Sequence, residues 1–214
     1  MIVAIDGPAG AGKSTVARAA ADALGFLYLD TGALYRAVAV AARHARVDAS
    51  DAAALAGLAA TIRVDPADGR VLVGERDVTA ELRDPEATAS VSLVAAHPEV
   101  RAALIPVQRR GAETHDVVVE GRDIGTTVFP GAGVKIFLTA EPAERARRRA
   151  RQLGRANEDE VARVAREISQ RDELDSARAA SPLMMAEDSV LLDTTDLTLD
   201  EVVARVVAIV RGEP

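Results

Sequence analysis

The chain contains no cysteine and no tryptophan, and its aromatic residues are two tyrosines and three phenylalanines. The lack of cysteine excludes a disulfide framework and thiol chemistry. The three histidines, at positions 44, 97 and 115, are too scattered to suggest a metal cluster. No apolar run approaches the roughly eighteen residues of a membrane span, and the N-terminus lacks the basic-then-apolar pattern of a signal peptide. We therefore expect a cytoplasmic protein.

The charge balance argues against a nucleic-acid polymer as a partner. The formal net charge is −7, whereas a polynucleotide groove needs a basic surface with aromatic stacking platforms. Small anions are compatible with an acidic protein, because local arginines can form a positive cleft. Lys13 and Lys135 are the two lysines, and the other cations are arginines. Arginine is the better bidentate partner for phosphate, although a biased base composition of the gene would give the same preference.

The most specific motif lies close to the N-terminus. Residues 7–14 have two glycines separated by four positions, followed by a lysine and a hydroxyl residue, which is the phosphate-loop pattern of nucleotide triphosphate sites. Backbone N–H groups of such a loop turn toward phosphate oxygens, the lysine reaches the outer phosphates, and the hydroxyl binds Mg²⁺. The short apolar run Ile2–Ile5 supplies the preceding strand. The predicted donor-binding residues, for ATP with Mg²⁺ on Ser14, are Gly7, Pro8, Ala9, Gly10, Ala11, Gly12, Lys13, Ser14 and Thr15.

Along the chain, strand-like runs alternate with helical ones, which predicts an α/β fold. At 214 residues the chain can bury a full core as one domain with insertions. We predict a P-loop NTPase-like, five-stranded parallel sheet with helices on both faces. The predicted strands are Ile2–Asp6, Phe26–Leu29, Val117–Glu120, Val134–Leu138 and Val190–Asp193. The first and last predicted helices are Lys13–Leu24, which ends at Gly25, and Leu199–Val210, which follows a capping sequence.

One stretch breaks this alternation. Residues 61–78 contain three short β-like segments separated by turn signals, which predicts a small antiparallel meander inside an insertion. Helical sequence follows from Pro85 to Arg110. We therefore predict a core domain of residues 1–31 and 115–214, and an acceptor-binding region of residues 32–114 at the carboxyl edge of the sheet, where ligands of such folds bind.

Two charged turns leave the ends of predicted strands. Arg36 lies one helical turn after the strand that ends near Leu29, where it can hold an acceptor phosphate or stay solvated on the helix face. Arg122 and Asp123 lie between glycines after the strand that ends at Glu120, where they can face one pocket or form a surface salt bridge. Glu120, at the strand tip, is placed to polarise a magnesium-bound water.

Two further clusters have helical spacing. Arg171, Asp175 and Arg178 fall at i, i+4 and i+7, so they share one helix face and suit a sugar phosphate, although an intrahelical salt-bridge ladder has the same spacing. Residues 144–151 are dense in arginine, and like charges at i, i+4 repel, a repulsion that a phosphate would relieve. With residues 153–159 they predict a short lid, at about 151–160, that closes over the donor nucleotide.

Taken together, residues 7–15, 29–36, 118–126 and 171–178, with a meander between the second and third of these, resemble the bacterial cytidylate kinases, a group of nucleoside monophosphate kinases. The resemblance runs from Ile2 to about Val210. It implies that the acceptor phosphate is held by Arg36, Arg122 and Arg178, that the ribose is contacted by Arg171 and Asp175, and that the base is read by Ser92, Arg101 and Asp123. It also implies that Arg148 and Arg149 of the lid contact the donor. Thr31 stands where serine is common, and Glu120 stands where aspartate is frequent.

The base-reading residues are chemically suited to cytosine. Asp123 can accept a hydrogen bond from the exocyclic amine, while Arg101 and Ser92 donate to the ring nitrogen and carbonyl. Uracil would reverse this pattern and leave buried polar groups mismatched. The predicted reaction is transfer of the γ-phosphoryl group of ATP to CMP, and to dCMP, giving ADP and the diphosphate, by a monomer that needs no nucleic acid or membrane partner.

Three other functions are known for proteins with a nucleotide-binding loop of this kind. A regulatory GTPase would need an Asn-Lys-x-Asp element, and the single asparagine, Asn157, begins Asn-Glu-Asp-Glu instead. A binding module without catalysis would not need a second, arginine-lined acceptor site. A P-loop kinase for another small anionic acceptor, such as shikimate or a different nucleotide, stays open at this point, because an arginine-rich cleft would serve any anion.

Overall fold

The computed structural model describes residues 1–65, 67–154 and 157–213. Within it the chain forms two compact units, one of residues 1–26 and 118–214 and the other of residues 27–117. We call them the nucleotide unit and the insertion unit. The predicted domain division after residues 31 and 114 lies a few residues from these limits and stays a prediction. Residues 155 and 156 of the predicted lid lie outside the described residues.

A five-stranded parallel sheet forms the framework of the fold, with the strand order β2-β6-β1-β7-β8. Its strands are β1 (Ile2–Asp6), β2 (Leu27–Asp30), β6 (Val117–Glu120), β7 (Val134–Thr139) and β8 (Val190–Asp193). In the nucleotide unit β1 pairs with β7, with Ile5 opposite Ile136, and β7 pairs with β8, with Phe137 opposite Leu191. Residues 3–5 of β1 are fully buried, as expected for an apolar strand covered on both faces. The predicted parallel sheet is confirmed.

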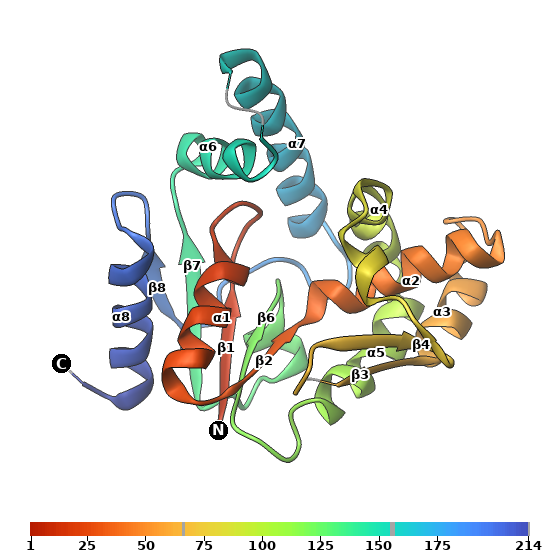
Figure 1. The fold of residues 1–214 in the computed structure, drawn as a ribbon, viewed down its shortest axis with the longest axis horizontal. Coiled ribbons are helices and arrows are strands. Elements are labelled where there is room, and N and C mark those ends of the chain that lie inside the picture. Colours follow the sequence, from red (N-terminus) through yellow and green to blue (C-terminus); the bar gives the residue numbers. More distant parts are fainter. Residues whose placement is uncertain (66, 155–156, 214) are drawn as a thin grey trace. The chain divides into compact units, whose positions relative to one another are not determined.

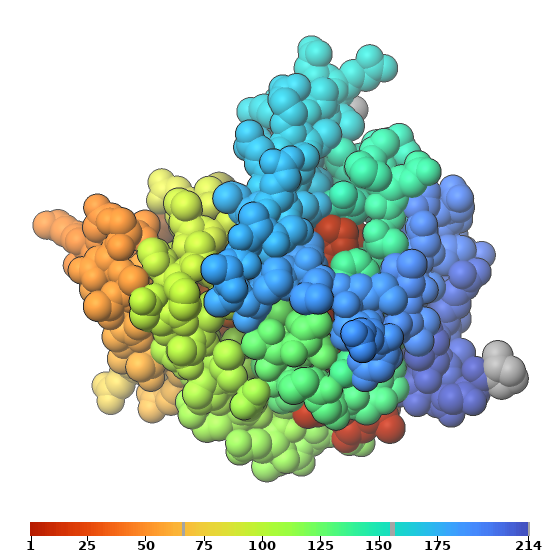
Figure 2. Space-filling model, turned by 180° about the vertical axis from the view of Figure 1, so that it is seen from behind, coloured from red at the N-terminus to blue at the C-terminus, as the bar shows by residue number. Residues whose placement is uncertain are grey.

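Helices and turns flank the strands of the nucleotide unit. They are α1 (Lys13–Leu24), η2 (Ile124–Val128), α6 (Pro142–Gln152), α7 (Glu158–Ser176) and α8 (Leu199–Arg211). Helix α1 packs against α8 and α6 packs against α7 (Figure 1). Helix α1 ends where Gly25 adopts a left-handed conformation, as predicted. Seen from behind in Figure 2, the green segment that follows β6 and the blue segment that precedes β8 form part of the visible face of this unit.

The insertion unit combines helices with a second, smaller sheet. Its elements are α2 (Thr31–Ala45), α3 (Ala52–Ala60), β3 (Ile62–Asp65), β4 (Arg70–Val73), β5 (Arg76–Asp77), η1 (Thr79–Arg83), α4 (Pro85–Ala96) and α5 (Pro98–Arg110). The sheet is antiparallel in the order β3-β4-β5, so the predicted meander is confirmed. Apolar residues of all four helices and of β3 and β4 form one core, which includes Leu34, Leu55, Ile62, Val91 and Leu104.

Several predicted boundaries differ from the structure. Strand β7 and helix α8 each end one residue later than predicted, at Thr139 and Arg211. Strand β2 lies one residue later than predicted. The helical run from Pro85 is interrupted at His97, which is extended (φ −76°, ψ 116°), because the residue before a proline avoids the helical conformation and Pro98 starts the next helix. Helix α7 ends at Ser176, so Arg178 lies beyond the helix. The prediction that Arg178 shares one helix face with Arg171 and Asp175 is therefore wrong.

Candidate active site

The phosphate loop leaves β1 at Gly7 and enters α1 at Gly12. Gly7 has φ +147°, and a Cβ there would lie 2.0 Å from the carbonyl oxygen of Leu138 in the neighbouring strand. Only glycine fits this position, since no side chain tolerates both the conformation and the contact. Gly12 is left-handed at the N-cap of α1, where helix N–H groups have no intrahelical partner and can face an anion. The loop therefore has the local structure of a phosphate cradle.

Lys13 lies inside this loop rather than in solvent. Its side chain is buried, and its Nζ donates to the carbonyl oxygen of Pro8 at 2.7 Å. Burial, and next the nearby guanidinium group of Arg122, hold the pKa of Lys13 well below its usual value. Arg171 acts in the same direction, whereas the carboxylates of Glu120 and Asp6 oppose the shift. The nucleotide unit thus brings five of its charged residues into electrostatic contact around the phosphate loop.

Asp6, at the tip of β1, holds the turn that carries Arg122 and Asp123. Its carboxylate accepts the backbone N–H of Ile124 at 2.8 Å and of Gly125 at 2.7 Å. Burial raises the pKa of Asp6 to about 6, although these two hydrogen bonds lower it. Asp6 is not among the predicted site residues. Its signal was a carboxylate at the end of an otherwise apolar strand.

Two of the predicted phosphate-binding arginines share one buried carboxylate. Arg122 Nε donates to Asp175 Oδ2 at 2.8 Å, and Arg178 pairs with Asp175 Oδ1. The Asp175 side chain is 1% exposed, so the two guanidinium groups compensate its charge. The structure therefore brings Arg122, Asp175 and Arg178 together. Arg178 lies just beyond the end of α7, where Ala177 keeps a right-handed helical conformation and donates its N–H to the Glu173 carbonyl.

In the insertion unit, Arg36 is also held by an aspartate. Asp30 caps α2 by accepting the N–H of Ala33 at 3.1 Å, and its other carboxylate oxygen binds Arg36 at 2.5 Å. Thr31 is buried at the start of the same helix. One carboxylate thus fixes both the beginning of α2 and the direction of Arg36.

The base-reading residues of this unit lie on two other helices. Arg101 of α5 is 3% exposed, and its guanidinium carbon lies 5.5 Å from the ring centroid of Tyr35 on α2, a cation–π contact. Ser92 is half-buried on α4, which packs against both α2 and α5. Tyr35 was not among the predicted site residues. Asp123, the third of the predicted base readers, is buried in the nucleotide unit.

Hard oxygen donors suited to Mg²⁺ are present at the loop. Ser14 is exposed at the first turn of α1, and Glu120 is buried at the end of β6. Among the described residues no group of three or more His, Cys, Asp and Glu side chains forms a metal cluster. This donor set fits a magnesium ion held mainly by nucleotide phosphates and water, since Mg²⁺ commonly takes one or two protein ligands in such sites.

The predicted lid arginines are paired within the nucleotide unit. Arg148 donates to Glu144 Oε1 at 3.0 Å and to the Thr194 hydroxyl at 2.8 Å, and Arg149 donates to Gln152 at 3.4 Å. Glu144 also pairs with Arg147 and Arg151. One carboxylate therefore compensates three arginines of α6. Part of their mutual repulsion is therefore already compensated, and contact of Arg148 and Arg149 with a donor stays a prediction.

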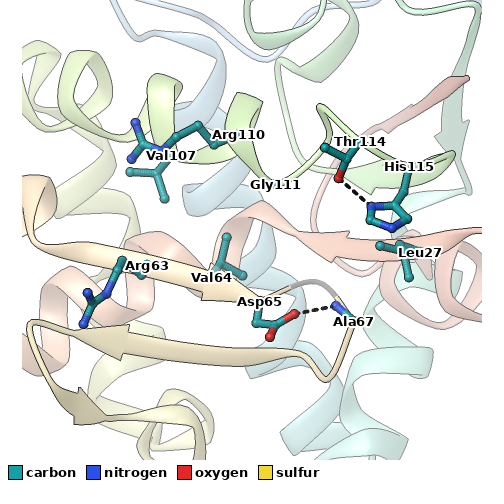
Figure 3. A pocket seen from close by; sticks show the side chains of 10 residues that line it. All are labelled: Leu27, Arg63, Val64, Asp65, Ala67, Val107, Arg110, Gly111, Thr114 and His115. Atoms are coloured by element: carbon teal, nitrogen blue, oxygen red, sulfur yellow. Dashed lines mark hydrogen bonds between the residues drawn. The ribbon is translucent and has the colours of Figure 1, made fainter.

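A separate hollow of about 390 Å³ lies in the insertion unit (Figure 3). Arg63 and Arg110 line it, but their guanidinium groups lie apart from each other and from the hydrogen-bonded pair Thr114 and His115 (Figure 3). None of the predicted site residues lines this hollow. Its polar groups do not converge on a common point, as those of a binding site would.

Comparison with known proteins decides the family. The family model described as cytidylate kinase matches residues 3–212. The chain belongs to the cytidylate kinase family. The cytidylate kinase of Desulfitobacterium hafniense is 48% identical over 97% of this chain and 91% of its own length. That of Mycobacterium leprae is 47% identical over 99% and 96%.

A solved structure supports the fold assignment of this family member. A shikimate kinase from Bacteroides thetaiotaomicron matches 99% of this chain and 98% of its own with a TM-score of 0.51 and 14% identity. At that identity the match concerns the fold alone. The described helices include none that combines the length and apolarity needed to cross a membrane.

Proposed function

We propose that this protein transfers the γ-phosphoryl group of ATP to CMP, giving ADP and CDP, and accepts dCMP as well. The observation that carries the proposal is that Arg122 and Arg178 both pair with the buried carboxylate of Asp175. They lie in the same unit as the phosphate loop, and the charge of Arg122 lowers the pKa of Lys13 in that loop. Membership of the cytidylate kinase family supports CMP over other anionic acceptors such as shikimate.

On the donor side, the loop N–H groups and Lys13 bind the phosphates of ATP. Lys13 exchanges its bond to the Pro8 carbonyl for an oxygen of the terminal phosphate. Ser14, with Glu120 acting through water, would hold Mg²⁺, which when bound neutralises charge on the transferred group. Arg148 and Arg149 contact the donor from α6.

On the acceptor side, Arg36, Arg122 and Arg178 bind the phosphate of CMP. Arg171 and Asp175 contact the ribose, while Ser92, Arg101 and Asp123 read cytosine. An oxygen of the CMP phosphate attacks the γ-phosphorus of ATP, and the bond from that phosphorus to the bridging oxygen of ADP breaks. The nucleophile is already an anion, so the residues act by positioning and charge compensation rather than as a general base.

The proposed reaction suits a monomer, because each predicted role is filled by residues of one chain. A cytoplasmic location agrees with the need for ATP.

The test is a panel of nucleoside monophosphates and shikimate with ATP and Mg²⁺, reading ADP and the phosphorylated product. We expect CMP and dCMP to react efficiently and UMP to have a kcat/KM lower by a factor on the order of 10⁴. Comparable rates with CMP and UMP would refute the roles of Asp123 and Arg101. As a control, Lys13→Met is expected to fold and to lose turnover, and retained activity would remove the loop from the mechanism.

A further inference from the structure

Ala9, in the middle of the phosphate loop, is held by side chains from two helices. Its N–H donates to Asp172 Oδ1 of α7 at 2.8 Å, and its carbonyl oxygen accepts from Arg145 Nη1 of α6 at 2.8 Å. Arg145 and Asp172 also pair with each other. Arg145 Nε is further fixed by the carbonyl of Ala140 at 3.1 Å. We call these two residues the Ala9 clamp.

Close packing reinforces the clamp. Ala9 lies in a small apolar cluster with Ala150 of α6 and with Val164 and Ile168 of α7. At the adjacent Gly10 a Cβ would lie 2.9 Å from the backbone oxygen of Arg145 and 3.1 Å from Ile168 Cδ1. The loop thus meets the backbone of α6 directly, and a shift of either helix would displace it.

The clamp uses both polar backbone groups of Ala9. Its N–H cannot serve a phosphate while it binds Asp172, so the loop must present the N–H groups that follow. The preceding carbonyl, of Pro8, binds Lys13. Fixing Ala9 therefore also fixes the backbone on both sides of it, the Pro8 carbonyl that binds Lys13 and the N–H groups that lead to the start of α1.

The clamp also places a carboxylate next to a site for a polyanion. Asp172 alone would repel the donor phosphates, and Arg145 compensates this charge at direct contact. Loss of Arg145 would leave the negative charge of Asp172 on the loop. Loss of the charge of Asp172 would leave an extra cation there.

We propose that Arg145 and Asp172 are positioning residues that hold the phosphate loop in its donor-binding form, with Arg145 also shielding the donor from Asp172. Neither residue is among the predicted site residues. The proposal rests on the proposed function in that the donor is ATP, but the clamp itself can be tested by binding alone.

The experiment measures ATP affinity of the full chain without acceptor, and CMP affinity without donor, by titration calorimetry. Arg145→Met is expected to weaken ATP binding about tenfold, the size of a lost charged hydrogen bond, while CMP affinity changes less than about twofold. Asp172→Ala, which loses the bond to Ala9, should weaken ATP binding more than Asp172→Asn, which keeps an acceptor oxygen. Glu173→Gln, on the next residue of α7, is the matched control and should bind both nucleotides as the parent does.

The double variant Arg145→Met/Asp172→Asn separates the two parts of the proposal. If Arg145 shields the donor, the double variant should bind ATP more tightly than Arg145→Met, because the uncompensated carboxylate is gone. Equal losses of ATP and CMP affinity, or an ATP affinity unchanged in both Arg145→Met and Asp172→Ala, would overturn the clamp. A parent protein that binds ATP but forms no CDP would instead refute the proposed function and leave the clamp standing.

Discussion

Asp175 lies among the residues that we propose bind the acceptor. It is almost fully buried and bears Arg122 and Arg178 on its two oxygens. The resemblance to the family implies only a ribose contact for it. The geometry adds a second role, because the direction of both guanidinium groups depends on this carboxylate.

We therefore predict that Asp175→Asn raises KM for CMP and for dCMP alike, by about tenfold or more, because both substrates carry the phosphate. The same change should lower the free energy of unfolding by about 3 kcal/mol, since two arginines lose a buried counter-charge. Steady-state kinetics with both substrates and chemical denaturation measure these effects. Ser176→Ala, on the adjacent exposed residue, is the control. A loss confined to CMP would leave the ribose contact as the sole role.

A second prediction concerns Asp6 and pH. Burial raises its pKa from the usual 3.8 to about 6, so the folded protein binds a proton there that the unfolded chain releases. Stability from this group is complete below the unfolded pKa and is lost as pH rises through about 6.

Against Asp6→Asn, which does not titrate, the parent should lose about 2 kcal/mol between about pH 4.5 and about pH 7.5. Urea unfolding of both proteins across that range gives the difference at each pH. Parallel curves would contradict the raised pKa.

At the scale of elements, α8 shows how local sequence fixes a boundary. Glu201 accepts the Thr198 N–H at 2.8 Å, and the Thr198 hydroxyl accepts the Glu201 N–H at 3.4 Å, a complete capping box. Thr198→Ala should lower the free energy of unfolding by about 1 kcal/mol and leave kcat unchanged. Thr198→Ser keeps the hydroxyl and should lose little by comparison. Thermal or urea unfolding of the three proteins decides the matter.

Local signals also explain which elements could be predicted from sequence. Apolar runs between turn residues predicted the strands, Gly25 predicted the end of α1, and a capping sequence predicted the start of α8. The break at His97 was not predicted, although the proline that follows it disfavours a helical conformation at that residue. The end of α7 at Ser176 was not predicted, because the charged residues from 171 to 178 have helical spacing although the helix ends two residues before Arg178.

At the scale of the whole molecule, substrate binding should raise the melting temperature of the protein. A ligand that binds the folded state alone, present at one hundred times its Kd, stabilises by about 2.7 kcal/mol. We predict that CMP without ATP raises Tm, and that UMP at the same concentration gives a much smaller rise. Differential scanning fluorimetry measures both, with cytidine as a control for the phosphate contribution. Equal rises for CMP and UMP would contradict base selection by Asp123 and Arg101.

The same scale shows where sequence reasoning stops. The motifs predicted the donor loop and the charged turns, because each is contiguous in the chain. The bond between Ala9 and Asp172 joins residues 163 positions apart, and the cation–π contact of Tyr35 with Arg101 depends on how two helices pack. Such pairings follow from the tertiary fold, so no local pattern could indicate them.

In each unit the arginines that we propose bind phosphate pair with an aspartate, Asp30 for Arg36 and Asp175 for Arg122 and Arg178. These carboxylates already compensate the charges of the arginines, so a chloride, sulfate or orthophosphate ion would gain little by binding there. A nucleotide, with its sugar and base contributing additional contacts, can outcompete that internal pairing where a bare inorganic ion cannot. The expected consequence is an enzyme that keeps working in a phosphate-rich medium.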